Sequence, residues 1–284
     1  MGISRYIKEI GRGKDGARAV TDLEVGGFCL AMRIKGETPD EMAGFLDATH
    51  ARLSKVPANA RPIVVLPSYN GARKLPVLTP LLALLLAREG LPVLVHGTPT
   101  EAKRIFASEV LAALGIKPMV SVDPVAPGEV VFAPTEVLCP GLKRLLDVRR
   151  VVGLRNPAHS LVKLMNPVDG PSLIVSSYTH PEYAASMAAT FELIGANALL
   201  LRGTEGEPVA DPRRTPQMEA FRHGQRMRVQ EAQGGSLASL PELPKGIDAT
   251  STAAYIQSVL AGRLAVPPPI AQQVEHILLA TSAS

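Results

Sequence analysis

The stretch that decides the fold reads Ile63-Val64-Val65-Leu66-Pro67-Ser68-Tyr69-Asn70-Gly71-Ala72-Arg73. An apolar run that ends in turn residues predicts a buried parallel strand, and open α/β sheets bind their ligands at the carboxyl ends of such strands. The loop matches neither G-x-x-x-x-G-K-[ST] nor G-x-G-x-x-G, so neither phosphate-binding fingerprint applies. Thr79 and Pro80 predict the N-cap and first residue of the next helix. These residues alone fit either an anion site or a plain first crossover of a sheet.

The composition is that of a large globular protein. The 284 residues are 46% hydrophobic, enough for one large domain or two unequal ones. The longest uncharged apolar run, residues 75–87, has 13 residues and two prolines, whereas a membrane span needs roughly 20. The N-terminus shows no apolar signal segment. We therefore expect a cytoplasmic protein without a membrane span, in which Cys29 and Cys139 are reduced core thiols.

Basic residues are concentrated in two segments. Residues 139–163 carry six lysines and arginines against Asp147, a local charge of +5, and residues 1–18 carry a local charge of +3. Such clusters attract polyanions. Aromatic residues make up only 4% of the chain, with no tryptophan, so a base-stacking platform for single strands is not expected.

The pattern of elements predicts an α/β protein with a small helical N-terminal domain and a large domain built on a mainly parallel sheet. Residues 1–60, with part of 140–168, form the predicted helical domain, and residues 61–284 form the α/β domain. The expected helices span 3–10, 23–34, 38–53, 79–87, 101–114, 141–165, 181–194, 251–262 and 270–280. The expected strands begin at residues 63, 92, 130, 172 and 198, and residues 203–246 are expected to be mostly loops.

Four segments resemble the anthranilate phosphoribosyltransferases of glycosyltransferase family 3. The resemblance covers nearly the whole chain, and it implies that family's helical domain and α/β domain. The segment from Gly153 is similar to the family's G-x-R-T-x-x-N-x-L-G-P-L-x-N-P. The matching segments are Gly153-Leu154-Arg155 with His159 and Asn166-Pro167, residues 93–97 with Arg104 and 110–115, residues 198–203 before Gly206, and residues 252–262.

The sequence departs from those enzymes where they bind phosphoribosyl pyrophosphate and magnesium. Residues 67–73 replace the enzymes' G-T-G-G-D loop, and Thr98-Pro99 replaces the Asn-Arg that follows their His-Gly. The Asp-Glu pair that holds magnesium falls near Pro208 and Val209. Because Mg²⁺ needs carboxylate oxygens beside the substrate phosphates, these departures predict that no such complex forms.

The departures themselves resemble one branch of the family, the YbiB-type proteins, whose run P-S-Y-N-G-A-R is matched residue for residue. That resemblance implies a homodimer with basic grooves that bind DNA and RNA without sequence preference, and no phosphoribosyltransferase activity. Apolar residues such as Leu23, Val25 and Phe28 exceed what one face of a small bundle buries, so we expect pairing through the helical domain.

The candidate site residues form two groups, and no catalytic residue, metal site or cofactor is predicted. Glu205 and Glu207, close in sequence to several arginines, are expected to form surface ion pairs. The predicted nucleic-acid-binding residues are Lys143, Arg144, Arg149, Arg150, Lys163, Arg12 and Lys14. The predicted vestigial ligand pocket comprises Ser68, Asn70, Gly71, Arg73, His96, Arg104 and Arg155.

Two other functions stay open. A phosphoribosyltransferase acting on an aromatic or nucleobase substrate, with phosphoribosyl pyrophosphate and magnesium, would have to bind pyrophosphate through Ser68, Asn70 and Arg73. A small-molecule sensor would use a pocket around Ser68, Asn70, His96 and Arg155.

Overall fold

A seven-stranded, mostly parallel sheet forms the centre of the molecule. The structure is a computed structural model that describes residues 20–237 and 240–282. The strand order is β4 (Val130–Pro134), β3 (Val93–Gly97), β2 (Ile63–Pro67), β6 (Ser172–Tyr178), β7 (Ala198–Arg202), β8 (Met218–Arg222) and β9 (Gln225–Gln230). The pairs β7–β8 and β8–β9 are antiparallel, and the other pairs of this sheet are parallel. The predicted α/β fold with a helical N-terminal part is confirmed.

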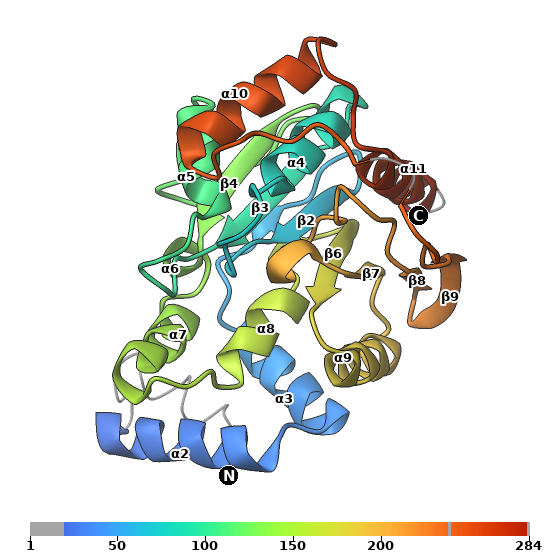
Figure 1. Cartoon of the computed structure of the whole chain (residues 1–284). Helices are drawn as coiled ribbons and strands as arrows, with labels where there is room; N and C mark the ends of the chain where they lie inside the picture. Colours follow the sequence, from blue (N-terminus) through green and yellow to red (C-terminus); the bar gives the residue numbers. More distant parts are fainter. Residues whose placement is uncertain (1–19, 238–239, 283–284) are drawn as a thin grey trace.

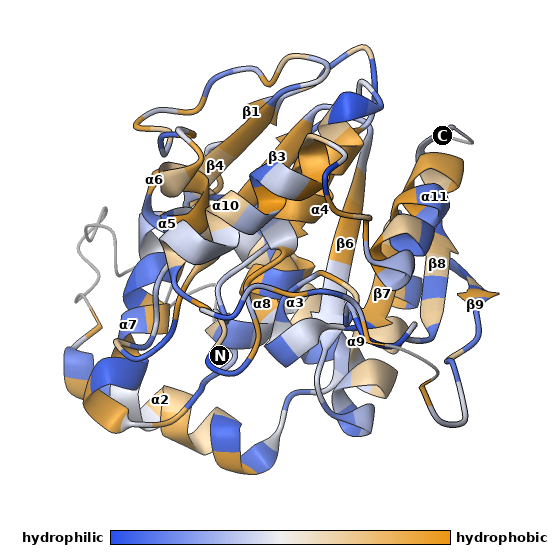
Figure 2. Cartoon of the chain, turned by 45° about the horizontal axis from the view of Figure 1, so that its top comes forward, coloured by the Kyte–Doolittle hydropathy of each residue, from blue (hydrophilic) through white to orange (hydrophobic). Residues whose placement is uncertain are grey.

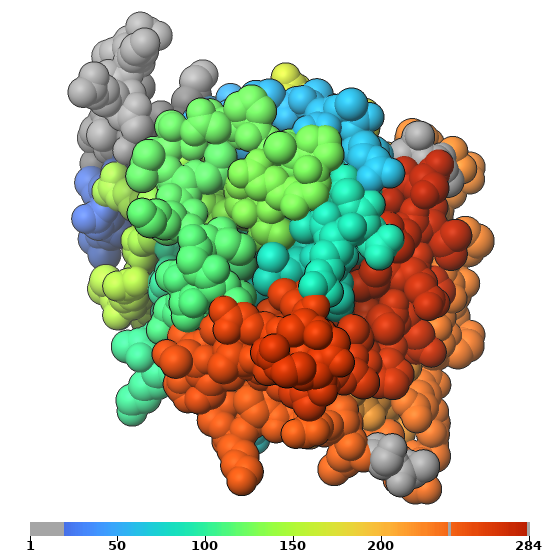
Figure 3. Space-filling model, turned by 90° about the horizontal axis from the view of Figure 1, so that it is seen from above, coloured from blue at the N-terminus to red at the C-terminus, as the bar shows by residue number. Residues whose placement is uncertain are grey.

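One face of the sheet is covered by helices from the middle and the end of the chain (Figures 1 and 3). Alternate strand residues such as Val64 and Leu66 point into this core, and Figure 2 shows the apolar character of the central strands. The C-terminal helices close the layer because they bury Ile256, Ile270 and Ile277. The helices of this face are α4 (Thr79–Arg88), α5 (Ala107–Ala113), α10 (Ala249–Leu260) and α11 (Pro268–Ser282).

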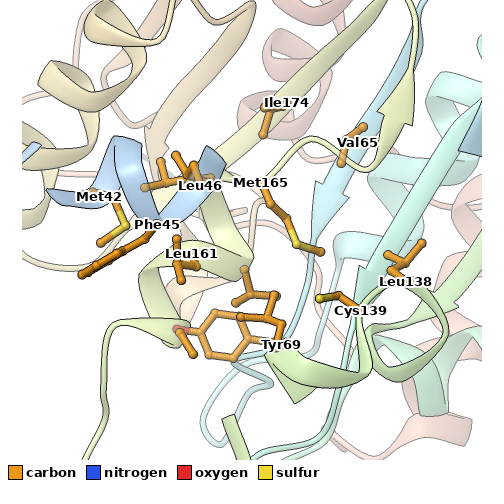
Figure 4. Packing of buried hydrophobic residues seen from close by; sticks show 14 of the residues in the cluster. Met42, Phe45, Leu46, Val65, Tyr69, Leu138, Cys139, Leu161, Met165 and Ile174 are labelled. Carbon is orange, nitrogen blue, oxygen red and sulfur yellow. The ribbon is translucent and has the colours of Figure 1, made fainter. Parts of the chain in front are cut away.

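The opposite face packs against the helices of the N-terminal part and of residues 135–193. Met42, Phe45 and Leu46 meet Leu161 and other side chains in one continuous core (Figure 4). Cys29 and Cys139 are buried thiols in it, as predicted. The helices of this face are α2 (Asp22–Lys35), α3 (Pro39–His50), α6 (Thr135–Leu138), α7 (Pro140–Val152), α8 (Ala158–Leu164) and α9 (Pro181–Leu193), and the pair β1 (Val56–Pro57) and β5 (Val168–Asp169) lies apart from the main sheet.

Local sequence explains where several helices begin and end. Thr21 and Thr38 form capping boxes with Glu24 and Glu41, which satisfy backbone N–H groups at the starts of α2 and α3. Gly153, at φ +76°, ends α7, so the helical segment predicted for residues 141–165 consists of the two helices α7 and α8.

One hairpin was not predicted from the sequence, and one helix starts later than predicted. Residues 203–246 contain the hairpin β8–β9, whose turn places His223 and Gly224 at positive φ, as a tight two-residue hairpin requires. The usual Asn-Gly or Asp-Gly signal is absent, which is why the sequence does not reveal it. The helix predicted for residues 101–114 begins only at Ala107.

Candidate functional site

The loop after β2 and the turn after β7 meet at the carboxyl edge of the sheet. Residues 68–75 follow β2, and the short 3₁₀ helix η1 (Thr204–Gly206) follows β7. In Figure 1 the yellow-to-orange segment that carries η1 lies beside β6. The hydrogen bonds between the two segments join residues 128 to 139 positions apart in the chain. The fold thus brings the predicted ligand loop against Glu205 and Glu207.

The Glu207 carboxylate is buried inside this contact. One of its oxygens, Oε1, accepts from the backbone N–H of Gly71 at 2.8 Å. Its Oε2 accepts from the hydroxyls of Ser68 and Thr79, the latter at 3.0 Å. Thr79 therefore is not the helix N-cap that the sequence predicts, because its hydroxyl binds Glu207 while Leu78 holds the cap position. Three donors of the β2 loop region converge on one internal carboxylate.

Glu205 closes the next part of the same loop. Its Oε2 accepts from the backbone N–H groups of Arg73 at 2.8 Å, Lys74 at 3.1 Å and Leu75 at 3.4 Å. Successive N–H groups that point to one spot form an anion-binding nest. The residue adopts φ +51°, a conformation that disfavours side chains other than glycine. The nest is thus filled by the protein's own carboxylate.

Among the described residues, neither glutamate forms the surface ion pair that the sequence predicts. Glu207 is 1% exposed, and the oxygens of both residues accept from the β2 loop region instead. Both carboxylates reach the loop because the backbone of the turn after β7 lies very close to it. A Cβ at Gly206 would clash with Asn70 Nδ2, and one at Gly203 would clash with the Glu207 carbonyl oxygen. Glycine at these positions lets the turn press against the loop.

Lys163 lies beneath this contact rather than on a basic surface. Its Nζ donates to the carbonyl oxygens of Ser177 at 2.7 Å and Gly206 at 2.9 Å, and only 8% of the residue is exposed. Burial lowers the pKa of Lys163 to about 7, although the nearby Glu207 carboxylate opposes this shift. The structure therefore removes Lys163 from the predicted nucleic-acid surface, because its ammonium is enclosed by backbone oxygens.

The predicted vestigial pocket is partly assembled. Asn70 donates to the Glu205 carbonyl and contacts Arg155, whose Nη2 lies 3.5 Å from Asn70 Oδ1. Arg104 donates to the Gly71 carbonyl at 3.1 Å. Ser68 belongs to the same group through Glu207, whereas the Arg73 side chain is exposed. A cavity next to Arg155 is lined by Tyr69, His159, Lys163 and Tyr183, among others.

Two histidines near this region are buried in their neutral form. Burial lowers the pKa of His96 to about 3, and neither ring nitrogen has a hydrogen-bond partner among the described residues. Burial, with the charges of Arg155 and Arg149, lowers the pKa of His159 to about 3. His159 also packs edge-on against Tyr69, with ring centroids 5.8 Å apart. Both side chains are therefore buried and uncharged at neutral pH.

The basic residues of α7 form a surface together with the loop before α5. We call Lys103, Lys143, Arg144, Arg149 and Arg150 the α7 surface. Arg149 pairs with Glu101, and Arg150 donates to the Pro99 carbonyl at 3.1 Å, which ties the loop to the helix. Lys143 and Arg144 pair with Asp147 and Asp22. Arg12 and Lys14, also predicted here, lie outside the described residues.

Sequence reasoning did not anticipate a second concentration of cations. Arg202, Arg213 and Arg214 line a cleft beside β7 together with Lys74. The three arginines lie close together in the sequence, whereas Lys74 comes from the loop after β2. The nearest signal was the arginine content of residues 202–214.

The described chain contains neither a cluster of metal ligands nor a helix suited to a bilayer. Across residues 20–237 and 240–282, no three His, Cys, Asp or Glu side chains are grouped so that they could hold a metal ion. Within the same ranges, no helix combines the length and apolar character needed to cross a bilayer.

Comparisons with known proteins agree with this fold. Residues 16–52 match the model of the glycosyl transferase family, helical bundle domain. The chain is 39% identical to the uncharacterized protein YbiB of Escherichia coli (strain K12), over 99% of this chain and 95% of that protein. It is 29% identical to an anthranilate phosphoribosyltransferase of Sorangium cellulosum, over 87% of this chain and 73% of the enzyme.

Solved structures extend the likeness to the whole fold. The crystal structure of anthranilate phosphoribosyltransferase from Thermus thermophilus superposes with a TM-score of 0.73, covering 99% of this chain and 84% of the enzyme at 21% identity. The enzyme from Saccharomyces cerevisiae in complex with PRPP and Mg gives a TM-score of 0.68 at 14% identity, over 99% of this chain and 82% of that one. At these identities the likeness describes the fold alone.

Proposed function

The chain belongs to the same family as Escherichia coli YbiB, and from this premise we propose that it is a cytoplasmic protein that binds DNA and RNA without sequence preference. The observation that carries the proposal is the α7 surface. Its five cations and Arg104 face three acids, Asp22, Glu101 and Asp147, which leaves a net charge of +3. A surface of this sign attracts the phosphate backbone.

The ion pairs on this surface do not prevent phosphate binding. Arg144 and Arg150 keep 47% and 60% of their side chains exposed. Exposed pairs contribute only about 0–1 kcal/mol each, so a phosphate can replace the carboxylate with little loss of stability. Arginine also binds phosphate oxygens in a bidentate manner.

No base readout is proposed, because the cations of α7 are assigned to phosphates, and contacts to phosphates carry no base information. If about four to five phosphates are contacted, log K should fall against log salt with a slope of roughly −4 for duplex DNA. Fluorescence anisotropy with two unrelated duplexes and one single strand over a salt series tests this. A flat salt response, or a preference of more than about tenfold for one sequence, contradicts the proposal.

The alternative, a phosphoribosyltransferase acting on an aromatic or nucleobase substrate, has less support. Such an enzyme needs donors for the pyrophosphate, yet the N–H groups of Gly71, Arg73 and Lys74 already bind Glu207 and Glu205. The two carboxylates are engaged with the loop and do not fit the role of a magnesium anchor. We expect no product from anthranilate and phosphoribosyl pyrophosphate with magnesium. Product above background, dependent on magnesium, would reverse this assignment.

We further propose that two copies pair through α2. Leu23 and Ile34 are 86% and 79% exposed, and Leu30 lies between them at helical spacing. A Cβ at Gly27, on the same stripe, would meet nothing within 4 Å, which leaves room for a second helix. Val25, named from the sequence as part of this face, is instead buried within the chain. Light scattering should give a dimer, and Leu23→Glu with Ile34→Glu should give a monomer.

A further inference from the structure

A cleft lies beside the carboxyl end of β7, next to the loop that Glu205 and Glu207 close. Its volume is about 790 Å³, within the roughly 300–1,000 Å³ of small-molecule sites. One part of its lining comes from the ends of β6 and β7, where Tyr178 and Arg202 are neighbours in register. Another part comes from residues 213–217 and 232–233. We call this feature the β7 cleft.

The β7 cleft carries an excess of positive charge. Lys74, Arg202, Arg213 and Arg214 line it, against the two acids Glu205 and Asp211. Both acids are already engaged. Asp211 holds the Arg213 guanidinium in a two-point pair of 2.9 and 2.7 Å, and Glu205 Oε2 accepts three backbone N–H groups. Both carboxylates therefore already bind groups of the protein itself.

The other cations remain available. Arg202 and Lys74 are exposed, and within the described chain neither side chain forms an ion pair or hydrogen bond. Arg214 donates to the Gln233 carbonyl at 3.0 Å, which holds its guanidinium in the lining while four of its five N–H donors stay available. The hydroxyl of Thr179 adds a neutral donor to the same cleft.

We propose that the β7 cleft binds the phosphate groups of a phosphorylated ligand, through Lys74, Arg202 and Arg214. Two arginines and a lysine around a concave site are the set that recognises phosphate oxygens in proteins. The Tyr178 ring at the end of β6 offers an apolar surface beside the charges. The ligand is either a free nucleoside phosphate or the phosphate chain of a nucleic acid. The cleft shares no residue with the α7 surface, so this inference goes beyond the proposed function.

Calorimetry on the full chain at low salt tests the assignment. The probes are inorganic pyrophosphate, adenosine 5′-diphosphate and a 12-nucleotide single-stranded DNA. Arg202→Ala and Lys74→Ala should each weaken at least one probe by about fivefold or more. Arg222→Ala, an exposed arginine on β8 outside the β7 cleft, is the matched control and should change no affinity by more than about twofold. Unchanged melting temperatures would show that all variants fold.

The pattern of losses identifies the source of the phosphate. A loss for diphosphate or pyrophosphate in Arg202→Ala, with none in Arg150→Ala, assigns a small-molecule site that does not depend on the α7 surface. A loss in Arg202→Ala for DNA alone assigns the phosphates of a nucleic acid. The proposal is overturned if neither cleft variant weakens any probe, or if Arg222→Ala weakens the same probe equally. For pyrophosphate or diphosphate, an equal loss in Arg150→Ala also overturns it.

Discussion

The loop after β2 and the β7 cleft both carry groups that could bind an anion, but only those of the loop are already bound to carboxylates of the chain. Both present hydrogen-bond donors suited to an anion, and they share a border at Glu205. In the loop, the donors point at carboxylates of the same chain. In the β7 cleft, the acids are occupied and the cations Lys74 and Arg202 face solvent. The number of hydrogen-bond donors alone therefore does not define an anion site. A carboxylate of the same chain can already accept the hydrogen bonds that an anion would need.

The largest effect should come from removing the buried carboxylate of the closed loop. Glu207→Ala leaves the Gly71 N–H and the Ser68 and Thr79 hydroxyls without their acceptor. Each unsatisfied buried group costs about 1–3 kcal/mol, so the free energy of unfolding should fall by roughly 3–5 kcal/mol. Urea denaturation measures the loss. Glu182→Ala, an exposed glutamate on α9, is the control and should stay within about 0.5 kcal/mol.

A stable Glu207→Ala variant would contradict the contrast between a closed β2 loop and an open β7 cleft. It would mean that water satisfies the three donors, and that the loop is not sealed from solvent. The β2 loop would then resemble the β7 cleft, and binding of phosphate there would have to be reconsidered.

Lys163, buried beneath the closed loop, should make the stability of the protein depend on pH. Its pKa is about 7 in the folded protein, below the ordinary value of 10.5, so the unfolded chain holds the proton more tightly. Stability should therefore rise between about pH 7 and pH 10.5, by about 1.4 kcal/mol per pH unit at most. Lys163→Met keeps the apolar stem and should flatten this rise in urea unfolding measured at pH 7, 8 and 9. Arg144→Met controls for the change in net charge, and an equally steep rise in Lys163→Met would contradict the prediction.

Glu205 tests whether the nest can be reopened. Glu205→Gly removes the carboxylate and also relieves the positive φ, whereas Glu205→Ala removes the carboxylate and keeps the strain. The left-handed conformation costs a non-glycine residue roughly 1 kcal/mol, so the glycine variant should be the more stable of the two.

Both variants should gain affinity for inorganic phosphate at the N–H groups of Arg73 and Lys74. Ligand binding to the folded state raises stability, so phosphate should raise their melting temperatures more than it raises that of the unaltered protein. Glu231→Ala, an exposed glutamate just after β9, is the control. No difference between the variants and this control would show that the nest does not bind anions even when it is empty.

The sequence predicted the parallel core well because its signals are local. Apolar runs of buried residues mark β2, β3 and β7, and Thr-x-x-Glu boxes mark the starts of α2 and α3. The hairpin β8–β9 was missed because its turn is His-Gly, and because Glu219, paired with Arg226, is buried in a strand that reads as polar.

The candidate site was harder to predict because its contacts are not local. Glu205 and Glu207 act on residues at least 128 positions away, and nothing near them in sequence distinguishes a sealing carboxylate from a surface one. Lys163 looked like one more cation of a basic segment. Its burial follows from the packing of α8 against β6, which depends on the whole fold.

The smallest expected effect concerns the open α7 surface. Arg150→Ala should weaken every nucleic acid about equally, by a few-fold, and should reduce the salt slope by about one, because one phosphate contact is lost. Arg144→Ala should do the same, and the double variant should lose about two units of slope, since exposed sites act almost independently. Arg228→Ala, on β9 away from this surface, is the matched control. Anisotropy titrations over a salt series, with two duplexes and one single strand, measure the slopes. If the two α7 variants keep the full slope while Arg202→Ala reduces it, the phosphate backbone binds in the β7 cleft. The nucleic-acid site would then lie in the β7 cleft, directly beside the loop that Glu205 and Glu207 close.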